Sequence, residues 1–396
     1  MKVMRIFDSD YPWEIRDERI CKGLINNGYK VDLVCANLKG FSRTEEVDGI
    51  AVSRMPPFSL LPSGFRKIFA FPFGFNPVWY FFLKSQIKEK RPDLIIVRDL
   101  PLVLAAIRIG RKYNIPVILD MAEPYPEFLR LLWKYEPFRF QNYFIRNPVF
   151  AEMIEKYAMK KVEHTFVVSE ETKVRLIEKY KVSEDKITIV GNTPIIENYL
   201  KYEPVKKETD DEIIINYTGM IGYSRGLDIA IKAIPKLKKK FKTVKLVLAG
   251  TGTADEDLKL LADKLGVNSE VEFKGFIPHK DAMNEIMKAD IGILPFHRCA
   301  HMELTIANKI YEYMLMEKAV LASDMLPMVN IINKHKCGRT FKAGDIDSFV
   351  NAVVELRDPN IRATMGASGR KAVLNEYNWT EDTERMVSTV NNILAN

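Results

Sequence analysis

Cysteine is scarce in this sequence, and its few copies lie far apart. The 396 residues include only Cys21, Cys35, Cys299 and Cys337, and no two of them form a CxxC pair. A disulfide framework is therefore not expected, and the pattern is typical of a reducing compartment. We predict a cytoplasmic protein.

Long hydrophobic runs are also missing. The longest, residues 78–83, has six apolar side chains, far fewer than the roughly 18 that a membrane-spanning helix needs. The N-terminus reaches Asp8 too early for the apolar region of a signal peptide. Hydrophobic residues make up 47% of the chain and charged residues 28%, which is ordinary for a folded enzyme, and the length predicts two or three domains.

Positive charge is in modest excess, and the excess is concentrated in one stretch of the sequence. The chain carries a net charge of +7, while residues 51–150 alone carry 15 basic and 7 acidic side chains. Ten aromatic residues lie within residues 58–82. Basic and aromatic side chains together favour contact with an anionic membrane surface, although the same residues could form a domain core beneath a loop. RNA binding would also fit, but no nucleic-acid motif accompanies the stretch, so we expect no nucleic-acid partner.

Short apolar runs alternate with helical patterns along the chain. The pattern pauses at the polar segment 198–212 and then restarts, which predicts an α/β fold with two doubly wound domains joined near residue 200. Two such sheets facing each other would form a cleft at the carboxyl ends of their strands, where ligands of open α/β sheets bind. The expected strands are residues 2–7, 31–36, 94–97, 117–120, 165–168, 213–218, 244–249, 271–274 and 291–294. The expected helices include residues 14–27, 102–113, 225–241, 256–265, 305–316, 345–356, 360–376 and 380–394.

The segment YTGMIGYSRGLD, residues 217–228, is the first candidate site. A strand ends at Thr218, Gly219 and Gly222 allow a tight turn, and a helix is expected to open near Arg225. Free backbone N–H groups, the helix dipole and a guanidinium would then meet at one spot, which suits a phosphate or diphosphate. The alternative is a plain turn with a surface arginine.

Two further segments suggest other ligands. The turn LAGTGT, residues 248–253, contains half of a dinucleotide-binding fingerprint, but a simple strand-to-helix turn explains it better because Asp255 replaces the third glycine. The segment HRCAH, residues 297–301, could supply zinc ligands, but no fourth ligand is visible. We interpret it as a polar loop and predict no metal site.

Acidic and basic side chains mark two more candidate regions. In NKIYEYM, residues 308–314, Lys309 and Glu312 share a helix face, and a carboxylate there could accept the hydroxyls of a ribose. Asp99 and Glu123 directly follow two neighbouring strands, where they could bind acceptor hydroxyls or take part in acid–base chemistry. The alternatives are a surface ion pair for the first region, and helix capping by Asp99 and a solvated loop at Glu123 for the second.

Taken in order, several segments resemble those of retaining glycosyltransferases of family four. They include residues 217–228, FKGFIP (273–278), ADIGILP (289–295) and NKIYEYM (308–314) in the second half. The first half agrees through RDERICKGL (16–24), RPDLIIV (91–97) and VVSEE (167–171). The form NKxxEYM resembles a subgroup linked to bacterial surface-polysaccharide synthesis.

The resemblance implies two Rossmann-like domains facing a cleft, the GT-B architecture. The N-terminal domain, residues 1–197, would bind the acceptor, and residues 198–377 would bind a nucleotide sugar of the UDP or GDP type without a metal ion or other cofactor. Residues 378–396 would form a helix that crosses back to the first domain.

Roles for single residues follow from the same resemblance. It implies donor contacts by Gly219, Gly222, Arg225, Phe276, Ile277, Thr305, Asn308, Lys309 and Glu312, with Glu312 holding the ribose and Arg225 and Lys309 near the diphosphate. With the helix start at residues 305–308, these cations would stabilise the leaving group. On the acceptor side we expect Arg16, Asp99 and Glu123, with Asp99, Glu123 and Arg225 as catalytic candidates. The expected acceptor is a lipid-linked saccharide at the inner face of the cell membrane.

Three positions depart from the family pattern: Met220, Leu304 and Ala122 stand where many members have arginine, glutamate and histidine. Two other functions stay open, and these departures favour the second of them. One is a nucleotide-sugar epimerase, and the other is a relative that binds a sugar nucleotide without catalysis.

Overall fold

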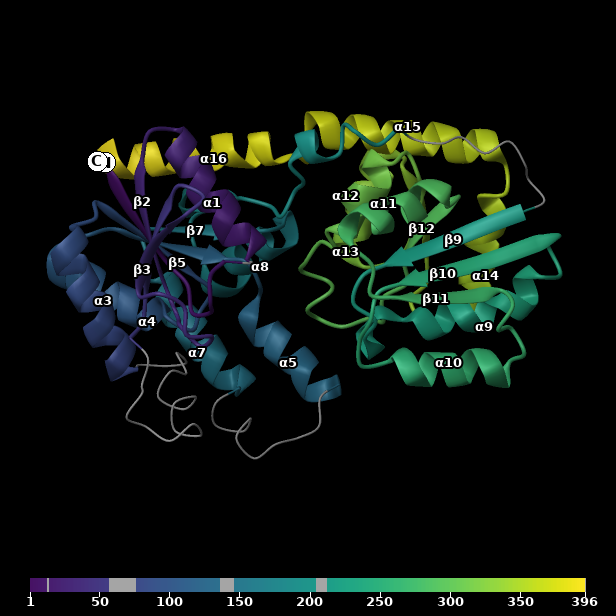
Figure 1. Ribbon diagram of the computed structural model, residues 1–396, viewed down its shortest axis with the longest axis horizontal. Coiled ribbons are helices and arrows are strands. Elements are labelled where there is room, and N and C mark those ends of the chain that lie inside the picture. The colour runs from purple at the N-terminus through teal and green to yellow at the C-terminus, as the bar shows by residue number, and fades with distance from the viewer. Residues whose placement is uncertain (13, 57–75, 136–145, 204–211, 396) are drawn as a thin grey trace. The chain divides into compact units, whose positions relative to one another are not determined.

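The computed structural model describes residues 1–12, 14–56, 76–135, 146–203 and 212–395. The chain divides into two compact units. Unit 1 comprises Met1–Asn192 with Asp382–Asn396, and unit 2 comprises Thr193–Glu381. Each unit is an α/β structure built around its own sheet (Figure 1), so the prediction of two α/β domains is confirmed.

The sheet of unit 1 has eight strands in the order β3-β4-β2-β1-β5-β6-β7-β8. All neighbours are parallel except β3 and β4, which pair antiparallel. The strands are β1 (Lys2–Ile6), β2 (Lys30–Cys35), β3 (Thr44–Val47), β4 (Ile50–Arg54), β5 (Leu94–Arg98), β6 (Val117–Met121), β7 (His164–Val167) and β8 (Ile187–Ile189). Central strands such as β5 are almost wholly buried, because helices cover both faces of a parallel sheet.

Helices cover both faces of this sheet. In Figure 1, α3 (Pro77–Lys90), α4 (Val103–Tyr113) and α7 (Pro148–Met159) lie on the face opposite α1 (Ile15–Asn26) and α16 (Trp379–Ala395). With α5 (Tyr125–Tyr135) and α8 (Glu170–Tyr180), the first three helices contribute to one continuous hydrophobic core. On the other face, α16 packs closely on α1, since a Cβ at Gly23 would lie 3.1 Å from the methyl carbon of Met386.

A buried charge network ties this sheet to α1. Arg5, on β1, is fully buried, and its guanidinium lies 2.6 Å from both Asp17 and Asp120. A buried guanidinium is tolerated only when it is paired and hydrogen-bonded. The network therefore positions the carboxyl end of β6 against the start of α1.

Unit 2 contains a six-stranded parallel sheet in the order β11-β10-β9-β12-β13-β14. Its strands are β9 (Glu212–Thr218), β10 (Thr243–Ala249), β11 (Val271–Gly275), β12 (Ile291–Leu294), β13 (Ala319–Ser323) and β14 (Gly338–Phe341). The helices are α9 (Leu227–Leu237), α10 (Asp255–Lys264), α11 (His279–Lys288), α12 (Lys309–Leu315), α13 (Leu326–His335), α14 (Ile346–Glu355) and α15 (Pro359–Asn375).

Two predicted helices begin later than expected. The helix expected at residues 225–241 starts at Leu227, because Gly226 adopts a left-handed φ of +65° and ends the preceding turn η3 (Tyr223–Arg225). The helix expected at residues 305–316 starts at Lys309. Thr305 is β-branched, which disfavours a helix, and its hydroxyl donates instead to the carbonyl of His301.

Only the end of the aromatic stretch 58–82 can be placed, because residues 57–75 lie outside the described residues. Trp79 and Phe82 are buried in the core of unit 1, whereas Phe81 is 63% exposed. The placed part of the stretch is therefore mostly core. No helix within the described ranges is both long and apolar enough to cross a membrane.

Candidate functional site

Two glycine-containing loops follow β9 and β10 and lie directly against each other. Gly219 and Gly250 have φ values of +134° and +146°, which side chains rarely adopt. A Cβ on Gly250 would lie 1.8 Å from the carbonyl oxygen of Gly219, and one on Gly252 would lie 2.1 Å from that of Ile221. This close packing explains the glycines of residues 248–253 without a bound dinucleotide.

Lys309 lies over the first of these loops. A Cβ on Gly219 would be 1.9 Å from Cε and 2.4 Å from Nζ of Lys309, so the missing side chain makes room for the lysine. Burial lowers the pKa of Lys309; Glu312 counteracts this effect and Arg225 adds to it. Lys309 is thus a partly buried cation with a second cation nearby.

Arg225 is that second cation, and it lies in the turn η3. Its guanidinium lies 5.0 Å from the ring centre of Phe296, and its Nε is buried without a hydrogen-bond partner. The turn is held by Gly226, where a Cβ would lie 1.9 Å from the carbonyl oxygen of Pro295. In the part of the chain that the structure describes, neither Arg225 nor Lys309 forms an ion pair with a carboxylate. Two neighbouring cations without such a partner suit a phosphate or diphosphate.

Glu312 lies one turn along α12 from Lys309. It accepts a hydrogen bond of 3.2 Å from the Tyr199 hydroxyl, and its carboxylate lies 3.5 Å from Nε2 of His279. The rings of Tyr199 and His279 meet edge to face, with 5.8 Å between their centres. The side chain of Glu312 is 19% exposed, so it can still reach a ligand. Sequence reasoning missed Tyr199 and His279 because neither belongs to a motif.

His297 joins the loop after β12 to the start of α9. Its Nε2 lies 2.9 Å from Asp228, which also accepts a hydrogen bond of 2.8 Å from Lys232. Burial alone would raise the pKa of Asp228, but the hydrogen bonds from His297 and Lys232 outweigh it and lower the pKa to about 2. Among the described residues, no group of three or more His, Cys, Asp or Glu side chains is placed to hold a metal ion. Within residues 297–301, His297 therefore has a structural contact, which connects this polar loop to α9.

The other predicted donor contacts also belong to unit 2. Phe276 and Ile277 directly follow β11, and Phe276 is 81% exposed. Asn308 precedes α12, but its side chain makes no capping hydrogen bond. At Gly222 the nearest atom to an added Cβ would be 4.0 Å away, so the loop is open there.

Of the three positions that depart from the family pattern, Leu304 lies beside a residue with clear structural partners. Glu303, next to Leu304, pairs with Arg298 and accepts a hydrogen bond of 2.8 Å from the backbone N–H of Leu326, the first residue of α13. It therefore caps a helix. Met220 is 59% exposed, and Ala122 is buried at 4% exposure.

In unit 1, Asp99 lies at the carboxyl end of β5 in a left-handed conformation, with a φ of +53°. Its carboxylate accepts a hydrogen bond of 3.1 Å from the backbone N–H of Glu123 and lies 3.5 Å from Nε of Arg98. The structure thus brings the two predicted acceptor-side acids together. Burial raises the pKa of Asp99 to about 7, although Arg98 opposes it.

Asp8 belongs to the same edge of the sheet, since it follows β1, the neighbour of β5. Burial raises its pKa to about 6. No motif pointed to Asp8, because a single aspartate after a strand is common. Groups that titrate near neutrality are typical of acid–base sites.

Arg16 is largely occupied by contacts within unit 1. It is 4% exposed, and its guanidinium binds Asp120 and the carbonyl oxygens of Val190 and Gly191, the latter two at 3.0 Å. Burial alone would raise the pKa of Asp120, but Arg16 and Arg5 outweigh it and hold the pKa below its ordinary value. Arg16 thus anchors the segment after β8, and its contact with an acceptor stays a prediction.

Each unit of the chain matches the model of a known glycosyltransferase family. Residues 18–193 match the model described as Glycosyltransferase Family 4, and residues 199–372 match that described as Glycosyl transferases group 1.

Curated relatives are distant and mostly match part of the chain. The putative glycosyltransferase EpsD of Bacillus subtilis is 27% identical over 166 residues, 42% of each chain. The GPI3 subunit of phosphatidylinositol N-acetylglucosaminyltransferase of Saccharomyces cerevisiae is 21% identical over 147 residues, 36% of this chain and 32% of that protein. The match thus spans less than half the length of both relatives. The capsular polysaccharide biosynthesis glycosyltransferase CapM of Staphylococcus aureus is 23% identical over 251 residues, 60% of this chain and 64% of that protein.

Solved structures match over almost the full length. Sucrose-phosphate synthase from Thermosynechococcus elongatus has a TM-score of 0.76 at 16% identity, covering 100% of this chain and 99% of that one. Anabaena HepE in complex with UDP has a TM-score of 0.69 at 13% identity, covering 99% and 100%. At such low identity the likeness shows the fold, which is that of GT-B glycosyltransferases.

Proposed function

We propose that this chain, a glycosyltransferase built of a Family 4 domain followed by a group 1 domain, transfers a sugar from a nucleotide-diphosphate sugar to a saccharide acceptor. We further propose that the transfer retains the anomeric configuration, needs no metal ion or cofactor, and uses a lipid-linked acceptor in the synthesis of surface polysaccharide or glycolipid. The names of GPI3 and CapM, which act in glycolipid and capsule synthesis, support this acceptor class.

The observation that carries the donor proposal is the pair of cations beside the glycine loops of unit 2. Arg225 and Lys309 lack a carboxylate partner within the described ranges, and Lys309 rests on Gly219, where no side chain intervenes. A diphosphate would provide the missing negative charge. The complexes of HepE with UDP and with UDP-glucose support a nucleotide-sugar donor on this fold.

Each neighbouring residue then has a defined task in the reaction. As the bond between the sugar and the diphosphate breaks, Arg225 and Lys309 stabilise the growing negative charge on the leaving oxygen. Glu312 accepts hydrogen bonds from the ribose hydroxyls, with Tyr199 holding its carboxylate in place. Phe276, which is 81% exposed, and Ile277 meet the base.

The acceptor chemistry is assigned to unit 1. With its pKa raised to about 7, the Asp99 carboxyl changes protonation state near neutrality, so it can hold or accept the acceptor hydroxyl proton. Its hydrogen bond to the backbone of Glu123 fixes its orientation. Asp99 and Glu123 are the residues we propose to contact the acceptor.

Donor binding can be tested by thermal denaturation with UDP, GDP, UDP-glucose and NAD. A nucleotide at about 100 times its Kd should stabilise the protein by about 2.7 kcal/mol. We expect this for UDP or GDP and not for NAD, and expect Arg225→Ala to abolish it. Arg339→Ala, which removes an exposed ion pair with Glu355 in unit 2, serves as the control.

Three results would reject the proposal. Stabilisation by NAD alone would make the donor assignment wrong. Stabilisation by UDP or GDP with no sugar transfer to any lipid-linked acceptor would favour the non-catalytic relative, and release of an altered nucleotide sugar without acceptor would favour the epimerase.

A further inference from the structure

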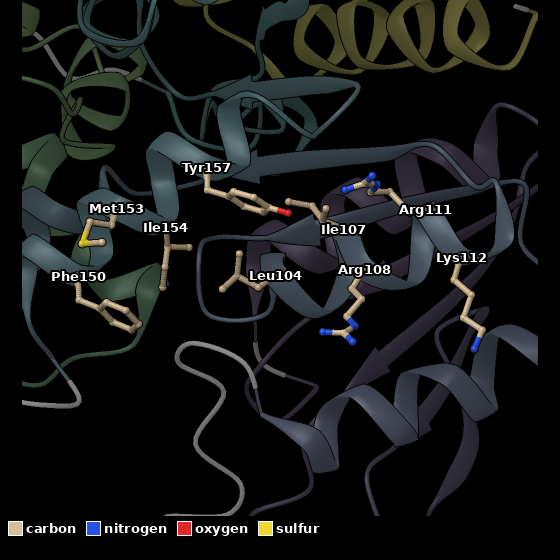
Figure 2. Close-up of a pocket in the computed structure, with 9 residues that line it drawn as sticks. All are labelled: Leu104, Ile107, Arg108, Arg111, Lys112, Phe150, Met153, Ile154 and Tyr157. Atoms are coloured by element: carbon tan, nitrogen blue, oxygen red, sulfur yellow. The ribbon is translucent and has the colours of Figure 1, made fainter.

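A hollow of about 740 Å³ lies between α4 and α7 of unit 1 (Figure 2). It is far in sequence from every residue assigned to the donor. The side chains that line it are of two kinds, apolar and basic, and none is acidic. On the α7 side they include Phe150, Met153 and Tyr157, and on the α4 side they include Arg108, Arg111 and Lys112.

The outer face of α7 is apolar where a soluble helix is normally polar. Val149 and Met153 are each 64% exposed, Tyr157 is 43% exposed and Phe150 is 42% exposed. Their spacing of three to four residues places them along one side of the helix. An amphipathic helix normally turns such a stripe toward the core. Here the stripe faces outward from the described residues, where an apolar environment would stabilise it.

The acidic side chains of α7 do not oppose this surface. Glu152 is paired with Arg130 and Lys179, and the buried Glu155 is paired with Arg175. All three partners belong to α5 and α8. The negative charges of α7 are therefore neutralised within unit 1.

The basic side chains of the surface lack such partners. Arg111, Lys112, Lys156, Lys160 and Lys161 are exposed, and within the described residues none of their side chains forms an ion pair. Basic residues near the carboxyl end of a helix interact favourably with its dipole, which would explain their presence by itself. It does not explain the exposed apolar stripe beside them.

We propose that the α4–α7 surface, formed by Arg111, Lys112, Phe150, Met153, Lys156 and Tyr157, binds the face of a bilayer that contains anionic phospholipid. The apolar side chains would enter the boundary between headgroups and acyl chains, and the basic side chains would pair with lipid phosphates. The inference rests on the proposed function in one respect: an enzyme that uses a lipid-linked acceptor must work at a membrane surface. It moves the contact away from residues 58–82, where Trp79 and Phe82 are core residues.

The test is sedimentation of the purified protein with vesicles of phosphatidylcholine, with or without 30% phosphatidylglycerol. We expect binding to the anionic vesicles, weakened by added salt. The double variant Arg111→Gln, Lys112→Gln should bind about 25-fold more weakly, since each basic residue near an anionic leaflet contributes about fivefold. Its matched control is Lys239→Gln, Lys242→Gln, two exposed lysines of unit 2.

The apolar stripe has its own matched pair of variants. Met153→Ser should weaken vesicle binding about tenfold, because a buried methionine side chain contributes about that much, whereas Leu260→Ser should not. The two side chains are equally exposed, at 64% and 65%, and Leu260 belongs to unit 2.

Three results would overturn the proposal: no sedimentation with anionic vesicles, equal sedimentation with both vesicle types, or full binding by the α4–α7 variants. Thermal denaturation confirms that each variant is folded. Vesicle binding requires neither donor nor acceptor, so its outcome is independent of the nucleotide test of the proposed function.

Discussion

Replacing Gly250 by alanine should destabilise unit 2 and disable the donor site together. A Cβ there would lie 1.8 Å from the carbonyl oxygen of Gly219, so the two loops would have to separate by more than 1 Å to reach an ordinary contact. Overpacking of this kind costs about 1–3 kcal/mol, and alanine at a φ of +146° adds about 1–3 kcal/mol of strain. For a unit of this size, each kcal/mol lowers Tm by about 2–4 °C.

Gly266→Ala supplies the control that separates strain from collision. Gly266 also has a positive φ, +64°, but no atom lies within 4 Å of its added Cβ. We expect its variant to lose only the strain energy, about 1–2 kcal/mol, and to keep its response to UDP or GDP. Differential scanning calorimetry with and without nucleotide measures both effects. Equal losses of Tm in the two variants would show that the collision between the loops does not contribute.

Three further predictions concern single residues. Glu312→Ala should raise the KM for donor with little change in kcat, because it removes ribose binding; an unchanged KM in steady-state assays would make the assignment wrong. Asp99→Asn should remove the pH dependence of turnover near pH 7, since the raised pKa of Asp99 places its ionisation there. Below pH 4 the side chain at position 99 is uncharged in both wild type and variant. As the pH rises from 4 to 7, the wild type should lose stability because Asp99 ionises while buried, whereas the variant should keep that stability. Gly222→Ala should leave Tm unchanged, because its Cβ meets nothing closer than 4.0 Å, yet weaken nucleotide binding if the diphosphate approaches that backbone, as calorimetry would show.

Apolar runs and glycine positions in the sequence were enough to predict the two α/β units and nine of their strands. The other five strands, β3, β4, β8, β13 and β14, were not predicted, although β13 is a fully buried parallel strand like those that were. The antiparallel pair β3 and β4 joins through Asp48 and Gly49, a turn dipeptide that the sequence does show, but the residues of β3 are polar and mostly exposed. The edge strand β8 has only three residues, too few for a periodic pattern to emerge.

The candidate site was predicted as a set of residues, but not as a set of contacts. That Gly250 supports Gly219 depends on two loops about thirty residues apart, whereas the sequence indicated only a simple strand-to-helix turn, with a dinucleotide motif as the weaker alternative. The task of Glu303 as the cap of α13 likewise depends on a helix that starts at Leu326. Such pairings follow from the tertiary fold, which local patterns do not encode.

Most of α16, from Asp382 onward, belongs to unit 1, and this has a consequence for how the chain is made. The backbone N–H of Gly191 donates to Asp382, and the face of α1 at Gly23 receives Met386. During synthesis from the N-terminus, unit 1 emerges first but lacks the helix that closes this face. All of unit 2 must be translated before α16 arrives, so unit 1 should reach its final stability only after unit 2 has been made. A fragment ending at Asn192 should therefore need residues 382–395 supplied separately or fused to its N-terminus.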